Sequence, residues 1–159
     1  MIFYKRIYTL LLCTFVLSGY ARINERNNMT HFSVQDGLSQ ISVLCIEQDA
    51  RGYLWFGTRN GLNRFNGYDF EVFVNDPAEI ASLSNNHVLC LEEDTSGNLW
   101  IGTRGGLNRY DPVSGHIMRY YDPRVDENVG HDFIYSLLWS ERDSVLWVGA
   151  NHGLYYYDP

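Results

Sequence analysis

The sequence DARGYLWFGTRNGLNRFNG at residues 49–67 returns twice, as DTSGNLWIGTRGGLNRYDP at residues 94–112 and ERDSVLWVGANHGLYYYDP at residues 141–159. The second copy begins 45 residues after the first, and the third begins 47 residues after the second. Each copy joins short apolar runs through glycine-containing turns. A repeat of this length and composition is typical of a β-propeller blade. The repeat therefore predicts an all-β chain.

Four strands are expected in each repeat. An apolar stretch precedes each copy, at residues 41–48, 87–93 and 134–140, and its near-continuous hydrophobicity is typical of a strand buried on both faces. A tight turn, the Leu-Trp-x-Gly strand, a glycine turn, a third strand and an outer strand follow. We therefore predict a β-propeller fragment of four-stranded antiparallel blades. It has two full blades at about residues 41–74 and 86–121 and a partial third at about 133–159.

The residues that recur in every copy have structural explanations. An Asp that opens a turn accepts hydrogen bonds from backbone amides, and a glycine adopts positive φ. A tryptophan at one strand position favours packing between blades over stacking on a sugar. The glycine two residues later leaves room for a neighbouring group, which we expect to be a ring of the next blade. The third copy lacks the turn glycine, which predicts a looser turn. The structural signature comprises Asp49, Gly52, Trp55, Gly57, Gly61, Asp94, Gly97, Trp100, Gly102, Gly106, Trp147, Gly149 and Gly153.

The two ends of the repeat region lack neighbouring blades in the sequence. The sequence His-Phe-Ser-Val at residues 31–34 predicts an outer strand that belongs to no blade of this chain. Propellers contain about 4–8 blades, so two blades and part of a third are too few to close a ring. Two blade faces and unpaired strand edges would be exposed. We expect the N-terminal piece of a longer protein, or the product of a truncated gene. Alone it should be unstable or self-associating, and its natural partners would be the remaining blades of a longer parent chain.

The first 21 residues resemble an export signal. Lys5 and Arg6 form a basic start, residues 7–17 are an apolar stretch, and Gly19 and Ala21 are small residues at a possible cleavage site. This pattern predicts a signal peptide at 1–21, a linker at 22–29 and an incomplete propeller at 30–159. The mature chain would then be periplasmic, without membrane insertion. An uncleaved N-terminal segment anchored in the inner membrane is the alternative.

Charge argues against nucleic acid as a partner. The net charge is −7, and Lys5 is the single lysine of the chain. Removing residues 1–21 takes away two basic residues and no acid, so −7 becomes −9. A lysine-free acidic chain lacks the basic patch that binds phosphate backbones. No cofactor is expected.

Cys45 and Cys90 lie one repeat apart. They should therefore occupy the same position on neighbouring blades. Sheets stack about 10 Å apart, whereas a disulfide needs Cα atoms within about 7 Å. The spacing predicts two buried free thiols that fill space as small apolar groups.

Candidate ligand residues lie in the loops between the second and third strands. Arg59 and Arg104 occupy this loop in two copies, and His152 occupies it in the third. These loops open on the face where propellers usually bind ligands, so the arginines could meet an acidic sugar or remain solvated. The histidines lack metal-ligand spacing, and no serine elbow or pair of carboxylates indicates catalysis. The sequence predicts no metal site and no catalytic site.

Several motifs together resemble the two-component regulator propeller repeat. They are Asp-Gly-Leu-Ser-Gln at 36–40, Gly-Tyr-Leu-Trp-Phe-Gly-Thr at 52–58, Gly-Leu-Asn-Arg-Phe-Asn-Gly at 61–67, Ser-Leu-Ser-Asn at 82–85 and Gly-Asn-Leu-Trp-Ile-Gly-Thr at 97–103. The third copy departs from the pattern at residues 150–151 and 155–156. The resemblance implies the exported sensor region of a bacterial hybrid two-component system, in which many members sense breakdown products of polysaccharides.

The resemblance favours extracytoplasmic ligand recognition, with a glycan-derived oligosaccharide as the expected ligand. No kinase pattern is present in the chain, so we expect no enzyme activity and no signalling output from it. Two alternatives stay open. The chain could be a protein-interaction scaffold, or a fragment of a carbohydrate-active propeller enzyme.

Overall fold

The fold consists of three antiparallel β-sheets, which confirms the predicted fold class of two full blades and a partial third. The computed structural model describes residues 29–120 and 132–158. All the strands lie in one compact unit, Phe32–Pro159. Blade 1 contains β1 (Val43–Gln48), β2 (Leu54–Thr58), β3 (Gly61–Phe65) and β4 (Phe70–Phe73). Blade 2 contains β5 (Val88–Glu93), β6 (Leu99–Thr103), β7 (Gly106–Tyr110) and β8 (Ile117–Tyr120). Blade 3 contains β9 (Ile134–Ser140), β10 (Val145–Ala150) and β11 (Gly153–Tyr157).

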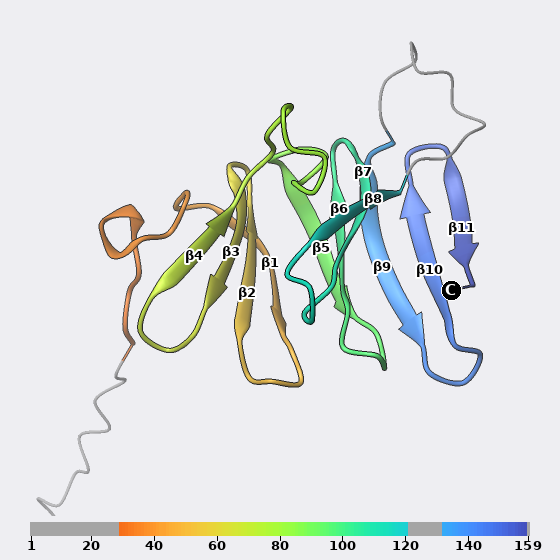
Figure 1. The fold of residues 1–159 in the computed structure, drawn as a ribbon, viewed down its shortest axis with the longest axis horizontal. Coiled ribbons are helices and arrows are strands. Elements are labelled where there is room, and N and C mark those ends of the chain that lie inside the picture. The colour runs from red at the N-terminus through yellow and green to blue at the C-terminus, as the bar shows by residue number, and fades with distance from the viewer. Residues whose placement is uncertain (1–28, 121–131, 159) are drawn as a thin grey trace, which may run out of the picture. The chain divides into compact units, whose positions relative to one another are not determined.

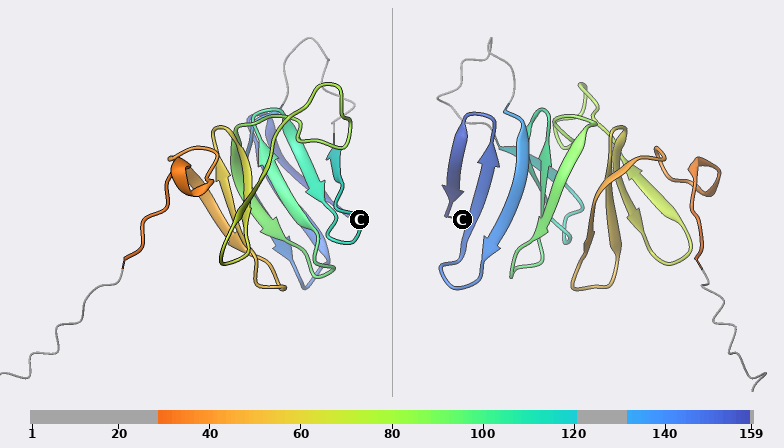
Figure 2. Two further views of the ribbon diagram at one scale, coloured as in Figure 1. Left: turned by 60° about the vertical axis from the view of Figure 1, so that its left-hand side comes forward. Right: turned by 180° about the vertical axis from the view of Figure 1, so that it is seen from behind.

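Each blade is a meander in which every strand pairs with the next along the chain. The first strands of the blades, β1, β5 and β9, lie side by side and in sequence order (Figure 1). The views in Figure 2 show the sheets following one another face to face. The loops between the second and third strands consequently lie at one end of the blades, and the turns between the first and second strands lie at the other.

The hydrophobic core lies between the blades. The 1–2 interface buries Trp55 and Leu62 of blade 1 against Val88, Leu91 and other residues of blade 2. The 2–3 interface is defined by Trp100 and Leu107 of blade 2 and by Ile134, Leu146 and Val148 of blade 3. Because each core is made of two facing sheets, a blade depends on its neighbour for burial.

The first strand of blade 1 differs from the sequence-based expectation. Residues 41–48 were expected to be buried on both faces, but β1 begins at Val43, and Val43, Leu44 and Ile46 are exposed. Among the described residues, no sheet covers this side of blade 1. The apolar pattern therefore shows which residues can be buried when another blade packs on this side. Their burial itself requires that neighbouring blade.

The predicted orphan strand at residues 31–34 is wrong. Residues 31–33 are not in a strand, and Val34–Asp36 form a 3₁₀ turn. Ser33 caps this turn: its hydroxyl accepts a hydrogen bond from the Gln35 amide, and its own amide donates to the Asp36 carboxylate. Such reciprocal capping favours a turn over an extended strand. The segment leads into blade 1, and Phe32 packs on the rings of Phe65 and Phe70.

The predicted signal peptide at 1–21 and most of the predicted linker at 22–29 lie outside the described residues. Within the described part of the chain, no helix is long and apolar enough to cross a membrane.

Candidate functional site

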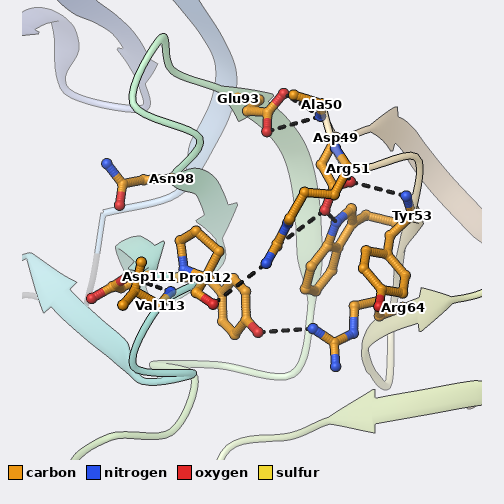
Figure 3. Close-up of polar contacts among 12 residues, drawn as sticks. Asp49, Ala50, Arg51, Tyr53, Arg64, Glu93, Asn98, Asp111, Pro112 and Val113 are labelled. Carbon is orange, nitrogen blue, oxygen red and sulfur yellow. Dashed lines mark hydrogen bonds and ion pairs between the residues drawn. The ribbon is translucent and has the colours of Figure 1, made fainter.

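The turn between the first and second strands is held by an aspartate in blades 1 and 2. In blade 1, the Asp49 carboxylate accepts hydrogen bonds from the amides of Arg51 and Tyr53, at 3.1 and 2.9 Å. It also accepts one from the Trp55 indole N–H at 2.9 Å. Figure 3 shows Asp49 with its turn neighbours Arg51 and Tyr53. Gly52 completes the turn with a φ of 90°.

Blade 2 repeats this arrangement. The Asp94 carboxylate accepts hydrogen bonds from the amides of Ser96 and Asn98 and from the Trp100 indole, the last at 2.9 Å. Gly97 has a φ of 79°. Both carboxylates are buried, and every bond named for them stays within its own turn and tryptophan. Asp49 and Asp94 therefore connect the turn to the core, which is a structural role.

Blade 3 lacks this connection. Glu141, at the aligned position, is exposed, and Ser144 takes the place of the turn glycine with a φ of 54°. Trp147 is also exposed, whereas the sequence predicted a core tryptophan in every copy. The reason is that no following blade packs on it among the described residues, whereas Trp55 packs on Tyr110 of blade 2 and Trp100 on Tyr157 of blade 3, at ring distances of 5.0 and 5.3 Å.

The strand glycines make room for groups other than the expected ring. A Cβ at Gly57 would lie 2.3 Å from the Cys45 sulfur and 2.7 Å from a Val88 methyl. A Cβ at Gly102 would meet the Cys90 sulfur at 2.4 Å and an Ile134 methyl at 2.7 Å. Each glycine thus accommodates the cysteine of its own blade and a β-branched side chain of the next. The ring of the next blade packs on the tryptophan instead.

Both cysteines are free thiols, as the repeat spacing predicts. They are half-buried, and Cys90 lies 3.5 Å from the carbonyl oxygen of Ile134. Burial raises the pKa of Cys45 to about 11 and that of Cys90 to about 12. Because the thiolate is the reactive form, these thiols fill space and do not act as nucleophiles at neutral pH.

An arginine on β3 crosses the 1–2 interface. The Arg64 guanidinium donates to the Tyr110 hydroxyl at 2.9 Å, pairs with Glu71 and lies 4.9 Å from the centre of the Tyr53 ring. Figure 3 shows Arg64 beside Tyr53. On the same interface, the Ala50 amide donates to the Glu93 carboxylate at 2.9 Å. These polar contacts fix how blade 2 sits on blade 1.

The sequence analysis missed a second set of buried polar residues, on β3 and β7. The Asn63 side chain accepts from the Ser39 amide at 2.8 Å, and the Asn108 side chain accepts from the Ser84 amide at 2.9 Å. Both asparagines are fully buried. In blades 1 and 2, the Leu-Ser pair before the first strand and the Leu-Asn-Arg motif on the third strand carried this signal. These contacts attach the incoming segment to blades 1 and 2, so they are structural.

The loop face at the opposite end of the blades contains the predicted ligand candidates Arg59 and Arg104. Both side chains are exposed. The Arg104 amide donates to the His87 carbonyl at 3.0 Å, and its guanidinium lies 5.4 Å from the centre of the Phe133 ring. Burial, and then the charges of Arg104 and Arg59, lower the pKa of His87. The charges of both arginines therefore act on His87, a residue that the sequence analysis had not singled out as a ligand candidate.

His152 has a different environment. Its Nδ1 lies 2.5 Å from a carboxylate oxygen of Asp132. The adjacent Asn151 side chain accepts a hydrogen bond from the Phe133 amide at 2.9 Å. This loop of blade 3 is occupied by contacts within the chain, so His152 is a poorer ligand candidate than the two arginines.

Metal chemistry finds no support in the described residues, which contain no group of three or more His, Cys, Asp or Glu side chains that could hold an ion. The loop face offers cationic and hydrogen-bonding groups, and these suit recognition of an anion.

Comparison with protein families identifies the repeats. Residues 37–60 and 82–105 match the two-component regulator propeller. These two stretches of the chain therefore match two-component regulator propeller repeats, as the sequence resemblance indicated. Each matched stretch begins at the incoming segment, which holds Ser39 or Ser84, and ends in the loop of Arg59 or Arg104. It therefore contains the Asp–Trp turn and part of the loop face.

The chain is similar to parts of much longer proteins. Histidine kinase P4 of Formosa agariphila is 40% identical over 78 residues, which are 49% of this chain and 6% of that protein. The extracellular domain of BT3049 of Bacteroides thetaiotaomicron, described as a hybrid two-component system, has a TM-score of 0.70 at 28% identity and covers 81% of this chain and 18% of that one. The extracellular domain of BT4673 from the same organism has a TM-score of 0.59 at 26% identity. That match covers 73% of this chain and 16% of the BT4673 chain.

The chain thus spans less than a fifth of the length of these three relatives. In the solved structures, the aligned part is an extracellular domain. The chain is similar to part of these extracellular domains.

Proposed function

We propose that this chain, which carries two-component regulator propeller repeats, is the ligand-recognising part of an extracytoplasmic sensor in a two-component system. The observation that carries the proposal is the match to the extracellular domain of a hybrid two-component system over 81% of the chain. The signalling output would come from a kinase region outside the chain. A ligand changes such output only if it binds two states of the receptor with different affinity.

The proposed ligand is an acidic oligosaccharide derived from a glycan. Arg59 and Arg104 supply two guanidinium groups, which pair well with carboxylate or sulfate. Burial, and then the charges of these two arginines, hold the pKa of His87 below its ordinary value, so the imidazole is neutral at neutral pH and can donate or accept a hydrogen bond. The Phe133 ring beside Arg104 adds an apolar surface for a sugar face.

Calorimetric titration with acidic oligosaccharides and with their neutral counterparts tests the ligand class. We expect the substitutions Arg59→Ala and Arg104→Ala each to weaken binding of the acidic ligands about 10-fold, which is the loss of one charge-assisted contact. Arg142→Ala is the matched control, because Arg142 is an exposed arginine at the opposite end of the blades. Equal binding by all three variants, or binding of neutral sugars alone, would rule out this ligand site.

The ionisation of His87 gives a second measurement. An anion bound to Arg59 and Arg104 would offset the charges that lower the pKa of His87, so we expect this pKa to rise when the ligand binds. Titration of the histidine ring by NMR, with and without the ligand, reports the change. An unchanged pKa in the presence of bound ligand would place the ligand elsewhere.

We also propose that the chain acts in the periplasm after removal of residues 1–21. Cell fractionation and N-terminal sequencing of the mature protein test this. A new N-terminus after Ala21 in the periplasmic fraction is the expected result. Recovery of the intact N-terminus in the inner membrane would favour the anchored alternative.

A further inference from the structure

The first strand of every blade contains a β-bulge near its loop end. In blade 1, the register with β2 shifts between Val43 and Cys45, so Leu44 between them has no partner on β2. The registers of blades 2 and 3 pass over Leu89 and Tyr135 in the same way. A bulge adds one residue to a strand and re-aims its side chain. Each blade therefore has one extra residue at the same point of its first strand.

Blade 2 shows where the extra residue lies. Val88 packs on blade 1 and Cys90 lies against blade 3, so the two neighbours of Leu89 face opposite blades. Leu89 is half-buried although sheets pack on both faces of blade 2. The first strand pairs with one strand only, so its other edge is free. The bulge residue thus stays accessible at this edge even in a blade that is covered on both sides.

The three bulge residues form a row beside the loop face. β1, β5 and β9 lie side by side, and each begins at the end of the blades where the loops of Arg59 and Arg104 lie (Figure 1). The row contains leucine in blades 1 and 2, whereas blade 3 has Tyr135, which is 56% exposed. An accessible aromatic ring therefore lies next to the proposed ligand site.

Phe133 connects this ring to an arginine of the site. The ring centres of Phe133 and Tyr135 are 6.3 Å apart, with an interplanar angle of 84°. On its other side, Phe133 lies 5.4 Å from the Arg104 guanidinium. A cation and two aromatic rings therefore follow one another along one continuous surface.

The backbone beside Tyr135 is held in place by the loop of blade 3. The Phe133 amide donates to the Asn151 side chain at 2.9 Å, and the Asn151 amide donates to the Phe133 carbonyl at 3.1 Å. The adjacent Asp132 carboxylate contacts His152. These contacts lie within the chain, so the aromatic pair is ordered without a ligand. A preorganised surface costs less conformational entropy on binding.

We propose that Tyr135 is a stacking platform for a sugar ring of the ligand whose acidic group binds Arg104. This assignment rests on the proposed function, because it concerns the same ligand site, and it narrows the ligand class. Only Phe133 separates Tyr135 from Arg104, so the acidic group lies on the stacked sugar or on the next one. A flat aromatic face packs against the C–H face of a sugar over a larger area than leucine does, and its hydroxyl stays in water.

Calorimetric titration of the full chain with short uronate-containing and sulfated oligosaccharides tests the platform. Tyr135→Ala should weaken binding of the acidic ligands about 10-fold, and Tyr135→Phe should keep the affinity within about 3-fold because the ring face remains. Tyr135→Leu introduces the residue of the other two blades and should lose most of the affinity that alanine loses. Tyr68→Ala is the matched control, because this exposed tyrosine lies in the hairpin between β3 and β4, at the opposite end of the blades.

The dependence of affinity on salt separates the ring from the charge. Salt screens the attraction between exposed charges, so Arg104→Ala should make the affinity less dependent on ionic strength. Tyr135→Ala should lower the affinity at every salt concentration and leave this dependence unchanged. A residue that only supports Phe133 and Arg104 would change it. Circular dichroism of each variant checks that the chain remains folded.

The outcomes distinguish failure of the platform from failure of the proposed ligand site. If Arg59→Ala and Arg104→Ala weaken binding but Tyr135→Ala does not, the ligand site stands and the platform is overturned. If no acidic oligosaccharide binds, both fail. If Tyr135→Phe weakens binding as much as Tyr135→Ala, the hydroxyl makes the contact, which overturns stacking on the ring face.

Discussion

Blades 2 and 3 share the Leu-Trp-x-Gly strand, yet their tryptophans have different environments. Trp100 is buried against Tyr120 and Tyr157, and its indole donates to Asp94. Trp147 is exposed and packs on Tyr156 of its own sheet. The comparison teaches that the repeat specifies strand pairing within a blade, whereas burial of the tryptophan depends on a following blade and its hydrogen bond on a turn aspartate.

The substitution Trp100→Ala tests the comparison most strongly. It removes a fully buried ring from the 2–3 interface, so we expect the free energy of unfolding to fall by about 3–5 kcal/mol. The same change at Trp147 should cost about 1 kcal/mol or less in the monomer, because the ring is already exposed. Chemical denaturation of both variants under monomeric conditions measures the difference. Equal losses would mean that Trp147 is buried in solution.

The turn aspartate gives the next largest difference. Asp94→Ala leaves the Trp100 indole and two backbone amides without their acceptor, so we expect a loss of about 2–3 kcal/mol. Glu141→Ala changes an exposed side chain at the aligned position and should change stability by less than about 0.5 kcal/mol. Thermal unfolding of the two variants compares them. A destabilising Glu141→Ala change would show that blade 3 has an equivalent contact.

The thiols should make blades 1 and 2 sensitive to alkaline pH. The pKa values of Cys45 and Cys90 are raised from about 9 to about 11 and about 12 in the folded chain. At a pH between about 9 and these raised values, the thiols are deprotonated in the unfolded chain but still protonated in the folded chain. The free energy of unfolding should therefore fall as pH rises above about 9.

Ser136 takes the cysteine position in blade 3 and has no proton to lose in this range. The double substitution Cys45→Ser and Cys90→Ser should therefore reduce the pH dependence, measured by denaturation between pH 8 and 11. An unchanged slope would assign the effect to other groups, such as Tyr120, whose pKa burial also raises.

The smallest expected effect is at the turn itself. Ser144 adopts a φ of 54°, a region that glycine occupies without steric cost, so Ser144→Gly should raise the stability of the chain by up to about 1 kcal/mol. Gly97→Ala, at the aligned position in blade 2, should lower it by about 1 kcal/mol because Gly97 has a φ of 79°. Paired thermal melts reveal the sign. Two changes of the same sign would show that φ at this position does not control stability.

The interface contacts also connect the fold to the proposed sensing role. Arg104 belongs to blade 2 and its guanidinium lies over Phe133, which directly precedes β9 of blade 3. A ligand bound at Arg104 would therefore touch the 2–3 interface at its loop end. Such a position allows ligand binding to favour one packing of neighbouring blades over another.

The sequence by itself determined the strands, their order and the turn chemistry. Short apolar runs and glycine turns are local signals, and they predicted β9 at residues 134–140 as the structure has it. They also predicted free thiols, because one repeat of spacing separates Cys45 from Cys90. Residues 31–34 were predicted wrongly because the Ser33–Asp36 cap outweighed their apolar pattern.

Only the tertiary structure decided which of the repeated residues are buried and which polar groups meet. The sequence alone does not distinguish Trp147 from Trp100, because burial of either one depends on a sheet that comes later in the chain. It also does not show that Ser39 meets Asn63 or that Arg59 and Arg104 both act on His87. These contacts join residues from different strands and blades, so they exist only once the sheets have stacked.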